Sequence, residues 1–397
     1  MVRDIAVTAI MPVVGFSLYC DLLALADWGQ GIERFTAIVF GAAVAFLLPA
    51  LPTVQVRAVL VTLAILAVAF FGFRTYEAGR RIAAGDGPAV DVGTTTIAAT
   101  ELVRQGEDPY STFIDPNGAG TNPEGRSFEY AAGFKYGPVM IWTYMPAVAF
   151  FGPDGYFVVN WLALMATALA AGLLLSGHLG SRAGIGAFLL TLVPGILGRE
   201  LFEAGFNDIV PVAFALLALV LRERDLPVGA GIALGLSIAT KFIPGAIIAL
   251  PMVMMFDKDR RRFGAAVVFT AIAGHLPWLV TSTPELIAGL VTFNLTRTVD
   301  DTSILHWVPE VLRLPFTVVV FGSALVLSTK HALAARRRGM GAFICLIAAT
   351  LAVSFAASPA VHGNYLLWYF PFIGLAVAAK LWRTPEGANN SSPTELV

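Results

Sequence analysis

The sequence predicts an all-helical protein that crosses a membrane many times. Of its 397 residues, 57% are hydrophobic and only 13% are charged, whereas a soluble globular chain carries about 25% charged residues. The formal net charge of −1 leaves no basic excess that could hold nucleic acid. The two cysteines, Cys20 and Cys345, each lie within an apolar run, which excludes a disulfide framework and a cysteine metal cluster.

Apolar runs long enough to cross a membrane follow one another along most of the chain, since about 20 apolar residues span the hydrocarbon core. They lie near residues 5–26, 34–52, 57–73, 137–152, 154–177, 183–198, 207–221, 226–256, 264–281, 307–329, 341–357 and 364–381. The run 226–256 is too long for one helix and is interrupted by Lys241 and Pro244. We therefore expect two short helices that meet at Lys241, where the backbone faces protein or a water-filled cavity.

Short basic loops predict the orientation, because lysine and arginine favour the cytoplasmic side. These loops contain Arg222 and Arg224, Lys258 with Arg260-Arg261-Arg262, Lys330 with Arg336-Arg337-Arg338, and Lys380 with Arg383. This orientation puts Asn207-Asp208, Lys241, the loop 282–306 and the segment 358–362 at the outer face. The long segment 74–136 is acidic and is interpreted as an outer loop.

The number of spans between this outer loop and Asn207 does not agree with that orientation. Three apolar runs, at 137–152, 154–177 and 183–198, separate the two, and an odd number of crossings leaves them on opposite faces. Either one run does not cross the membrane or one assignment is wrong. The run 183–198, which Pro194-Gly195 interrupts, is the first candidate.

Polar residues, which are costly inside a membrane protein, collect at the outer face. Asp91 precedes residues 92–105, where Val92, Ala99, Leu102 and Val103 would share one side of an amphipathic helix lying on the membrane. A carboxylate at this position could cap the helix, or could act as a general base at the membrane boundary.

Five further polar elements are expected at the same face. They are Phe134-Lys135-Tyr136-Gly137-Pro138, Arg199-Glu200 with Asn207-Asp208, Lys241, the segment 294–306 with Arg297, and the segment 358–365 with His362. Each has a structural interpretation: an aromatic belt, a self-neutralising ion pair, a snorkelling or paired lysine, solvated charge, or a bystander histidine. Together they suit chemistry on a substrate delivered by lipid.

The order of these elements resembles the GT-C superfamily of integral-membrane glycosyltransferases, and more narrowly glycosyltransferase family 87, over residues 91–371. The residues that carry the resemblance are Asp91 with Gly106 and Tyr110 downstream, Phe134-x-Tyr136-x-Pro138, Gly205-x-Asn207, Thr240-Lys241-x-x-Pro244, and Ser358-Pro359 followed by His362 and Trp368. Thr94, Thr95 and Thr96 stand where family members often carry an aromatic residue.

The resemblance implies a bundle of roughly 11–13 transmembrane helices with juxtamembrane helices in a large outer loop. We expect one transmembrane domain, residues 1–381, in which 74–136 is the outer catalytic loop, followed by a disordered cytoplasmic tail, 382–397. The implied activity is transfer of mannose from a polyprenyl-phosphate donor to a lipid-linked or glycolipid acceptor, with inversion, at the outer face of the plasma membrane. Asp91 would be the catalytic base, Lys241 would lie near the donor phosphate, and His362 would line the same cavity.

The remaining candidates for binding the donor phosphate or substrate are Tyr136, Asn207, Asp208, Arg199 and Arg297. A single displacement needs one carboxylate base and a cation for the leaving phosphate, and no second carboxylate as nucleophile. Neither a P-loop nor a convincing Gly-x-Gly-x-x-Gly segment is present, which favours a lipid-linked donor over a nucleotide sugar. No cofactor is certain; a divalent cation bound by Asp91 with Asp86 or Asp208 is an open option.

Other functions are compatible with the sequence. A membrane transporter or lipid flippase would spread its polar residues through the membrane depth and would often show an internal repeat. A scaffold protein of the cell envelope would make Asp91 and Lys241 dispensable. Within the glycosyltransferases, polyprenyl-phosphate-arabinofuranose and polyprenyl-phosphate-glucose are alternative donors.

Overall fold

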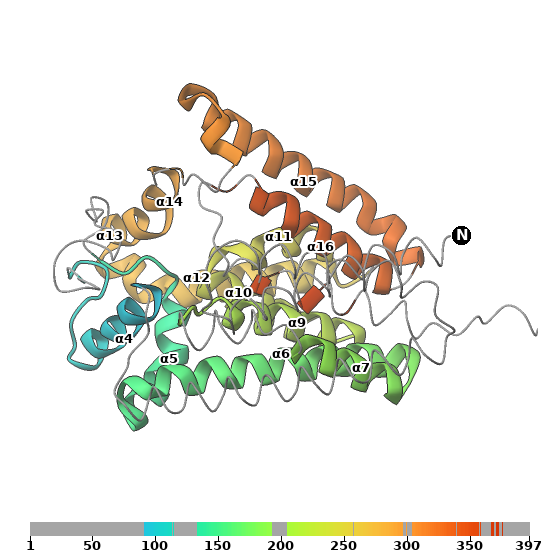
Figure 1. Ribbon diagram of the computed structural model, residues 1–397, viewed down its shortest axis with the longest axis horizontal. Helices are drawn as coiled ribbons and strands as arrows, with labels where there is room; N and C mark the ends of the chain where they lie inside the picture. Colours follow the sequence, from blue (N-terminus) through green and yellow to red (C-terminus); the bar gives the residue numbers. More distant parts are fainter. Residues whose placement is uncertain are drawn as a thin grey trace, which may run out of the picture.

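All regular structure in the described part of the chain is helical (Figure 1). The computed structural model describes residues 91–112, 114, 133–192, 205–256, 258–296, 299, 304–338, 340–356, 358, 367–368, 371–372 and 375. The predicted spans 5–26, 34–52 and 57–73, most of 364–381 and the predicted tail 382–397 lie outside these residues. Within them, the predicted all-helical bundle is confirmed.

Each apolar run predicted within the described residues corresponds to a helix or to a pair of helices. The long helices are α4 (Asp91–Arg104), α5 (Pro138–Phe151), α6 (Gly155–Leu179), α7 (Ser181–Leu192), α9 (Ile209–Glu223), α10 (Pro227–Thr240), α11 (Phe242–Val253), α12 (Arg260–Thr281), α15 (Glu310–Arg338) and α16 (Met340–Ala356). Short helical turns connect them: η2 (Gly152–Asp154), α13 (Thr283–Ile287), the π-helical η4 (Ala288–Thr292), α14 (Phe293–Thr296) and η5 (Ile304–Trp307).

Among the described residues, three helical stretches are long and apolar enough to cross a membrane. They are 138–177, which joins α5 and α6, 260–281 and 310–333, and α10 and α11 are shorter apolar helices. Large apolar side chains on α12 and α15, such as Phe269, Val280 and Val319, are exposed. Contiguous apolar surface of this kind is rare on a soluble monomer but is normal where lipid is the solvent.

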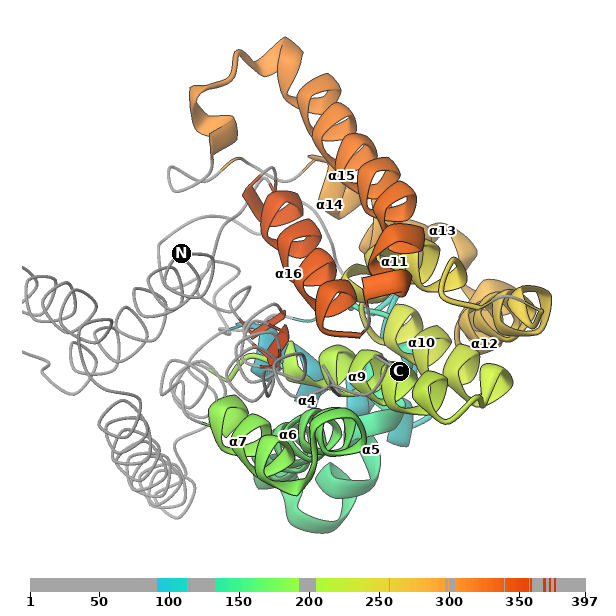
Figure 2. The same cartoon turned by 90° about the vertical axis from the view of Figure 1, so that its right-hand side faces the viewer.

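Helix α10 forms the centre of the bundle, between α9 and α12, and α6 packs on the other side of α9 (Figure 2). Two glycines bring α10 close to α12. A Cβ atom on Gly231 would lie 2.6 Å from the Phe263 carbonyl oxygen, and one on Gly235 would lie 2.8 Å from that of Val267. Small residues at helix crossings allow this close backbone approach, which stabilises helix pairs inside membranes.

The predicted helix break at Lys241 is confirmed. Lys241 separates α10 from α11 with an extended backbone, at φ −152° and ψ 121°. Ile243 is also non-helical, at ψ 140°, as expected for a residue that precedes proline. The break places the Lys241 side chain at the end of α10 rather than along the apolar side of a continuous helix.

The packing of α5, α6 and α7 bears on the odd number of apolar runs between residues 137 and 207. Gly180 turns the chain between α6 and α7, and Gly172 and Gly184 let the two helices pack closely as a hairpin. The chain then returns to the beginning of α6, where the Tyr156 hydroxyl donates to the Gly205 carbonyl oxygen. Gly205, which follows α7 in the sequence, therefore lies at the same end of the bundle as the start of α6.

Helix α5 begins and ends at the same end of the bundle as the start of α6. At its start, the Gly137 N–H donates to the carbonyl oxygen of Thr240, next to Lys241. In its middle, the Tyr144 hydroxyl donates to Asn160, in the second turn of α6. Figure 1 shows α5 steeply inclined to α6. This packing favours α5 over our first candidate, 183–198, as the run that does not cross, and residues 193–198 of that candidate lie outside the described part.

Two of the basic loops, at residues 222–224 and 258–262, lie at the opposite end of the bundle from Asp208 and Lys241. Helix α9 runs from Ile209, directly after Asp208, to Glu223. The Arg222 guanidinium donates to the Met255 carbonyl oxygen, past the end of α11, at 3.0 Å. Helix α12 begins at Arg260 in this basic region and carries Trp278 back to the ring of Tyr110, with a centroid separation of 5.5 Å. The Asp208–Lys241 pair and these basic residues thus lie at opposite ends of the same helices.

Helix α4 forms where it was predicted but buries a different set of side chains. Val92 and Ala99 are buried as expected, whereas Leu102 and Val103 are only half-buried. The buried side also contains Thr95, Thr96 and Thr100, whose hydroxyls bond to carbonyl oxygens of the preceding turn. Helix α4 packs against α5 through this side, so it faces protein rather than only the membrane surface.

Candidate active site

A buried ion pair lies at the centre of the candidate site. The Lys241 ammonium nitrogen is 2.5 Å from Asp208 Oδ1, and the two side chains are 15% and 0% exposed. The indole N–H of Trp368 donates to the same carboxylate oxygen at 2.5 Å. A buried charge is tolerated when it is paired and hydrogen-bonded, so Asp208 holds the cation in a place where an isolated lysine would be unstable.

Two aromatic rings enclose the same ammonium group. Its nitrogen lies 4.8 Å from the ring centroid of Tyr136 and 5.5 Å from that of Trp368. Ring faces attract cations at these distances, and more strongly where water is excluded. The Lys241 charge is therefore localised by one carboxylate and two rings, instead of snorkelling freely to the interface.

Backbone hydrogen bonds hold Tyr136 in position. The Phe134 N–H donates to the Pro109 carbonyl oxygen at 2.8 Å, and the Tyr110 hydroxyl donates to that of Tyr136 at 2.7 Å. Burial, and after it the nearby Asp108 carboxylate, raise the pKa of the Tyr110 hydroxyl well above its usual value, so this donor stays protonated. The two loop segments that flank residues 113–132 are thereby joined beside Lys241.

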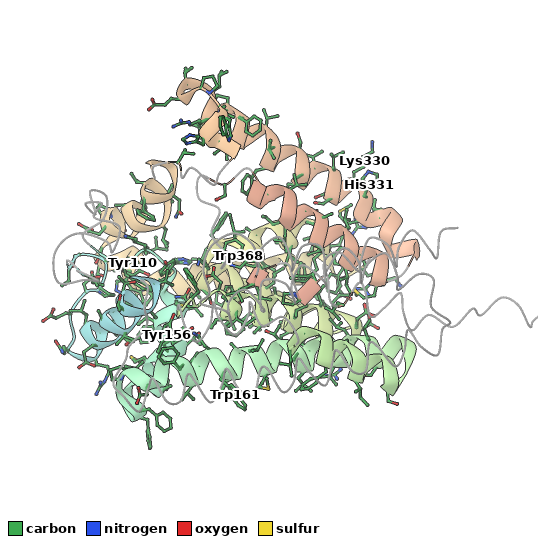
Figure 3. The ribbon with its side chains drawn as sticks, in the orientation of Figure 1. Tyr110, Tyr156, Trp161, Lys330, His331 and Trp368 are labelled. Carbon is green, nitrogen blue, oxygen red and sulfur yellow. The ribbon has the colours of Figure 1, made fainter. Side chains whose placement is uncertain are left out.

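A second group of hydrogen bonds holds the segment that leads into Asp208. Gly205 has a positive φ of 83°, which favours glycine, and its carbonyl oxygen accepts from the Tyr156 hydroxyl at 2.6 Å. Asn160 Nδ2 donates to the Phe206 carbonyl oxygen at 3.1 Å. In Figure 3, Tyr110, Tyr156 and Trp368 all lie to the left of Lys330 and His331, which are in the last part of α15.

Asn207 connects this segment to α4. Its Nδ2 donates to Thr96 Oγ1 at 3.0 Å, and both side chains are fully buried. Asp91 is the first residue of α4 and directly precedes Val92, whose carbonyl oxygen accepts from the Thr96 hydroxyl. The beginning of α4 is therefore linked to the segment that carries Asp208.

The structure brings together four of the predicted site residues: Tyr136, Asn207, Asp208 and Lys241. The backbone of Asp91 is placed at the start of α4, but its side chain lies outside the described part. Arg199, Arg297 and His362 also lie outside the described residues. Among the described residues, no three His, Cys, Asp or Glu side chains converge as metal ligands.

Several contributors were not selected from the sequence. Trp368 was used only as part of the family resemblance, and Thr96 only as a departure from it. Tyr144, Tyr156 and Asn160 were not considered at all. An asparagine within the apolar run 154–177 is a signal that could have been used, because polar side chains inside spans face a partner or a cavity.

Gly137→Ala is expected to reduce activity by separating Tyr136 from Lys241. A Cβ atom at this position would lie 2.1 Å from the Ala239 carbonyl oxygen, so the start of α5 must move away from the end of α10. Overpacking of this kind costs about 1–3 kcal/mol. Thermal unfolding in detergent and turnover at saturating substrate measure the two effects. The matched control is Gly264→Ala on α12, where a Cβ meets nothing within 4 Å; an equal loss in both variants would contradict the prediction.

Comparisons with known proteins agree with this architecture. The model of the family described as glycosyltransferase family 87 matches residues 134–359, and no curated protein matches the sequence. Among solved structures, ArnT from Cupriavidus metallidurans in the apo state is 16% identical, with a TM-score of 0.50, over 83% of this chain and 60% of ArnT. The same protein bound to undecaprenyl phosphate is 18% identical, with a TM-score of 0.53, over 82% of this chain and 60% of ArnT. The chain thus spans about 60% of the length of ArnT, and at this identity the likeness shows the fold alone.

Proposed function

The chain belongs to glycosyltransferase family 87, and we propose that it transfers mannose from a polyprenyl-phosphate donor to a lipid-linked or glycolipid acceptor. The observation that carries the proposal is the Lys241 ammonium group, held by Asp208 between the rings of Tyr136 and Trp368. A buried cation at the end of an apolar bundle suits a phosphate that is attached to a long hydrocarbon chain. The similar fold of ArnT, which has been solved with undecaprenyl phosphate, supports this donor class.

Lys241 would stabilise the leaving group. As the bond between the anomeric carbon and the phosphate oxygen breaks, negative charge grows on the polyprenyl phosphate. An ammonium group has three N–H donors, and the Asp208 carboxylate accepts one of them. A preorganised donor in a water-excluded site contributes about 3–4 kcal/mol to such a transition state.

Asp91 would act as the general base. It would take the proton of the acceptor hydroxyl as that oxygen attacks the anomeric carbon, in one displacement that inverts the centre. The contact from Asn207 to Thr96 links the start of α4 to the segment that carries Asp208. Base and cation would then lie on opposite sides of the reacting carbon, as a displacement requires.

We propose that the reaction takes place at the outer face of the plasma membrane. Arg222 and the basic residues 258–262 lie at the end of the bundle opposite Lys241. Because short basic loops favour the cytoplasm, the Lys241 end would face outward. Of the remaining candidates, Arg199, Arg297 and His362 are proposed as further substrate-binding residues.

We expect the purified protein in nanodiscs to transfer labelled mannose from synthetic polyprenyl-phosphate-mannose to a membrane lipid extract. The assay is run beside arabinofuranose and glucose donors on the same polyprenyl phosphate, with and without EDTA. Product stereochemistry, read by NMR, should be inverted relative to the donor. Preferred transfer of another sugar would overturn mannose and keep the enzyme class. Movement of the labelled lipid across the bilayer with no covalent product would favour a flippase instead.

A further inference from the structure

The side chain of Asn207 holds a hydrogen-bond acceptor that the described residues leave without a donor. Asn207 is fully buried, and its Nδ2 donates to Thr96 Oγ1. Among the described residues, no donor reaches its Oδ1 atom. A buried acceptor without a donor is destabilising, so one that persists in a folded protein indicates a missing partner such as a ligand or a water molecule.

Thr96 determines which way the amide of Asn207 points. The Thr96 hydroxyl has a single proton, which it donates to the Val92 carbonyl oxygen at 2.7 Å. Its oxygen can therefore only accept from Asn207. With the amide turned by 180°, Thr96 could donate to Asn207 only by giving up its bond to Val92, so the network is best satisfied with the amide nitrogen facing Thr96 and the carbonyl oxygen left over.

The neighbours of Asn207 indicate what kind of group could donate a hydrogen bond to its Oδ1 atom. The next residue, Asp208, holds the Lys241 ammonium group, and Thr96 bonds back to Val92, the residue after Asp91. Asn207 thus connects the part of the site assigned to the phosphate with the part assigned to the base. A phosphate oxygen is an acceptor and cannot bond to Oδ1, whereas a sugar hydroxyl can donate to it.

We propose that Asn207 Oδ1 accepts a hydrogen bond from the 3-, 4- or 6-hydroxyl group of the sugar that is transferred. Asn207 is then a residue that determines sugar specificity. The inference rests on the proposed function, in which the donor phosphate lies at Lys241. Because the sugar is attached directly to that phosphate, it would lie between Lys241 and Asp91, the two parts of the site that Asn207 connects.

The test uses polyprenyl-phosphate-mannose and its 3-deoxy, 4-deoxy and 6-deoxy analogues. The 2-position is left intact because its substituent changes the reactivity of the anomeric carbon. In the wild type, one of the three deletions should lower kcat/KM by about 10- to 100-fold, as expected when a buried polar group loses its partner. Asn207→Ala should lower kcat/KM for the intact donor by a similar factor, and should show no further loss with that deoxy donor.

Thr96→Val is the matched control. It removes the group that orients the amide but keeps the Asn207 carbonyl, so overall turnover should fall while the preference for the intact donor persists.

Equal discrimination by the wild type and Asn207→Ala would overturn the proposal and assign Oδ1 to a buried water molecule. If Asn207→Ala does not fold, the wild type alone decides, since tolerance of all three deoxy donors also overturns it. If the wild type discriminates only against acceptors that lack a hydroxyl, the group that donates to Oδ1 belongs to the acceptor, and this also contradicts the proposal. Failure of the wild type to use the intact donor would count against the proposed function, not against this contact.

Discussion

Lys241→Met is expected to lower sugar transfer by about 10²–10³-fold and to destabilise the protein. The substitution keeps most of the apolar stem and removes only the charge. It leaves the fully buried Asp208 carboxylate without its cation, and removing one partner of a buried pair costs about 3–5 kcal/mol. Transfer from polyprenyl-phosphate-mannose and thermal unfolding in detergent measure the two effects separately.

A double variant separates the two roles of Lys241. In Lys241→Met combined with Asp208→Asn, no buried charge is left, so most of the lost stability should return. Transfer should not return, because the cation that stabilises the leaving phosphate is still missing. The matched control is Arg262→Met, which breaks an exposed pair with Asp259 and should cost at most about 1 kcal/mol. Recovery of transfer in the double variant would show that Lys241 serves only to neutralise Asp208.

The spans and the helix break were predictable because they depend on local chemistry. Long apolar runs form helices in a membrane, since each backbone polar group must be satisfied within its own segment. Pro244 cannot continue the hydrogen-bonding of α10, and Lys241 cannot face lipid at that depth. The sequence therefore located the break at the residue where the structure has it.

The orientation of α5 was not predictable from its sequence. Its residues are apolar on every side, so no periodic pattern distinguishes a helix that crosses the membrane from one that lies across the bundle. What fixes α5 is the contact of its first residues with Thr240 and of Tyr144 with Asn160. Such contacts join residues far apart in sequence, and they arise only when the helices pack.

The candidate site was partly predictable for the same physical reasons. Asn207, Asp208 and Lys241 attract notice because they interrupt apolar runs, and Tyr136 because it lies in an aromatic segment ending in proline. Their pairing was not predictable, since Asp208 could have paired with Arg199 or with Lys241. The role of Thr96 was hidden because threonine is unremarkable in a helix. Only its contact with Asn207 shows that it links α4 to the segment carrying Asp208.

Asp91→Asn is expected to reduce transfer by about 10²–10⁴-fold while leaving the fold intact. An amide cannot take a proton from the acceptor hydroxyl, and general-base assistance contributes a factor of this size. Asparagine caps a helix about as well as aspartate does. If Asp91 only caps α4, the substitution should therefore have almost no effect. The measurement is single-turnover transfer at saturating donor, together with donor binding, which should be unchanged.

The matched control is Asp108→Asn, in the loop that follows α4. Asp108 Oδ1 accepts from the Tyr110 N–H at 2.8 Å, a bond that an asparagine oxygen can also accept, so transfer should be retained. Equal transfer by Asp91→Asn and the wild type would move the base elsewhere. Asp208 would then be a weak candidate, because its Oδ1 already accepts from both Lys241 and Trp368. His362, which the sequence predicts at the outer face, would be the residue to substitute next, since histidine is the side chain that most often acts as a general base.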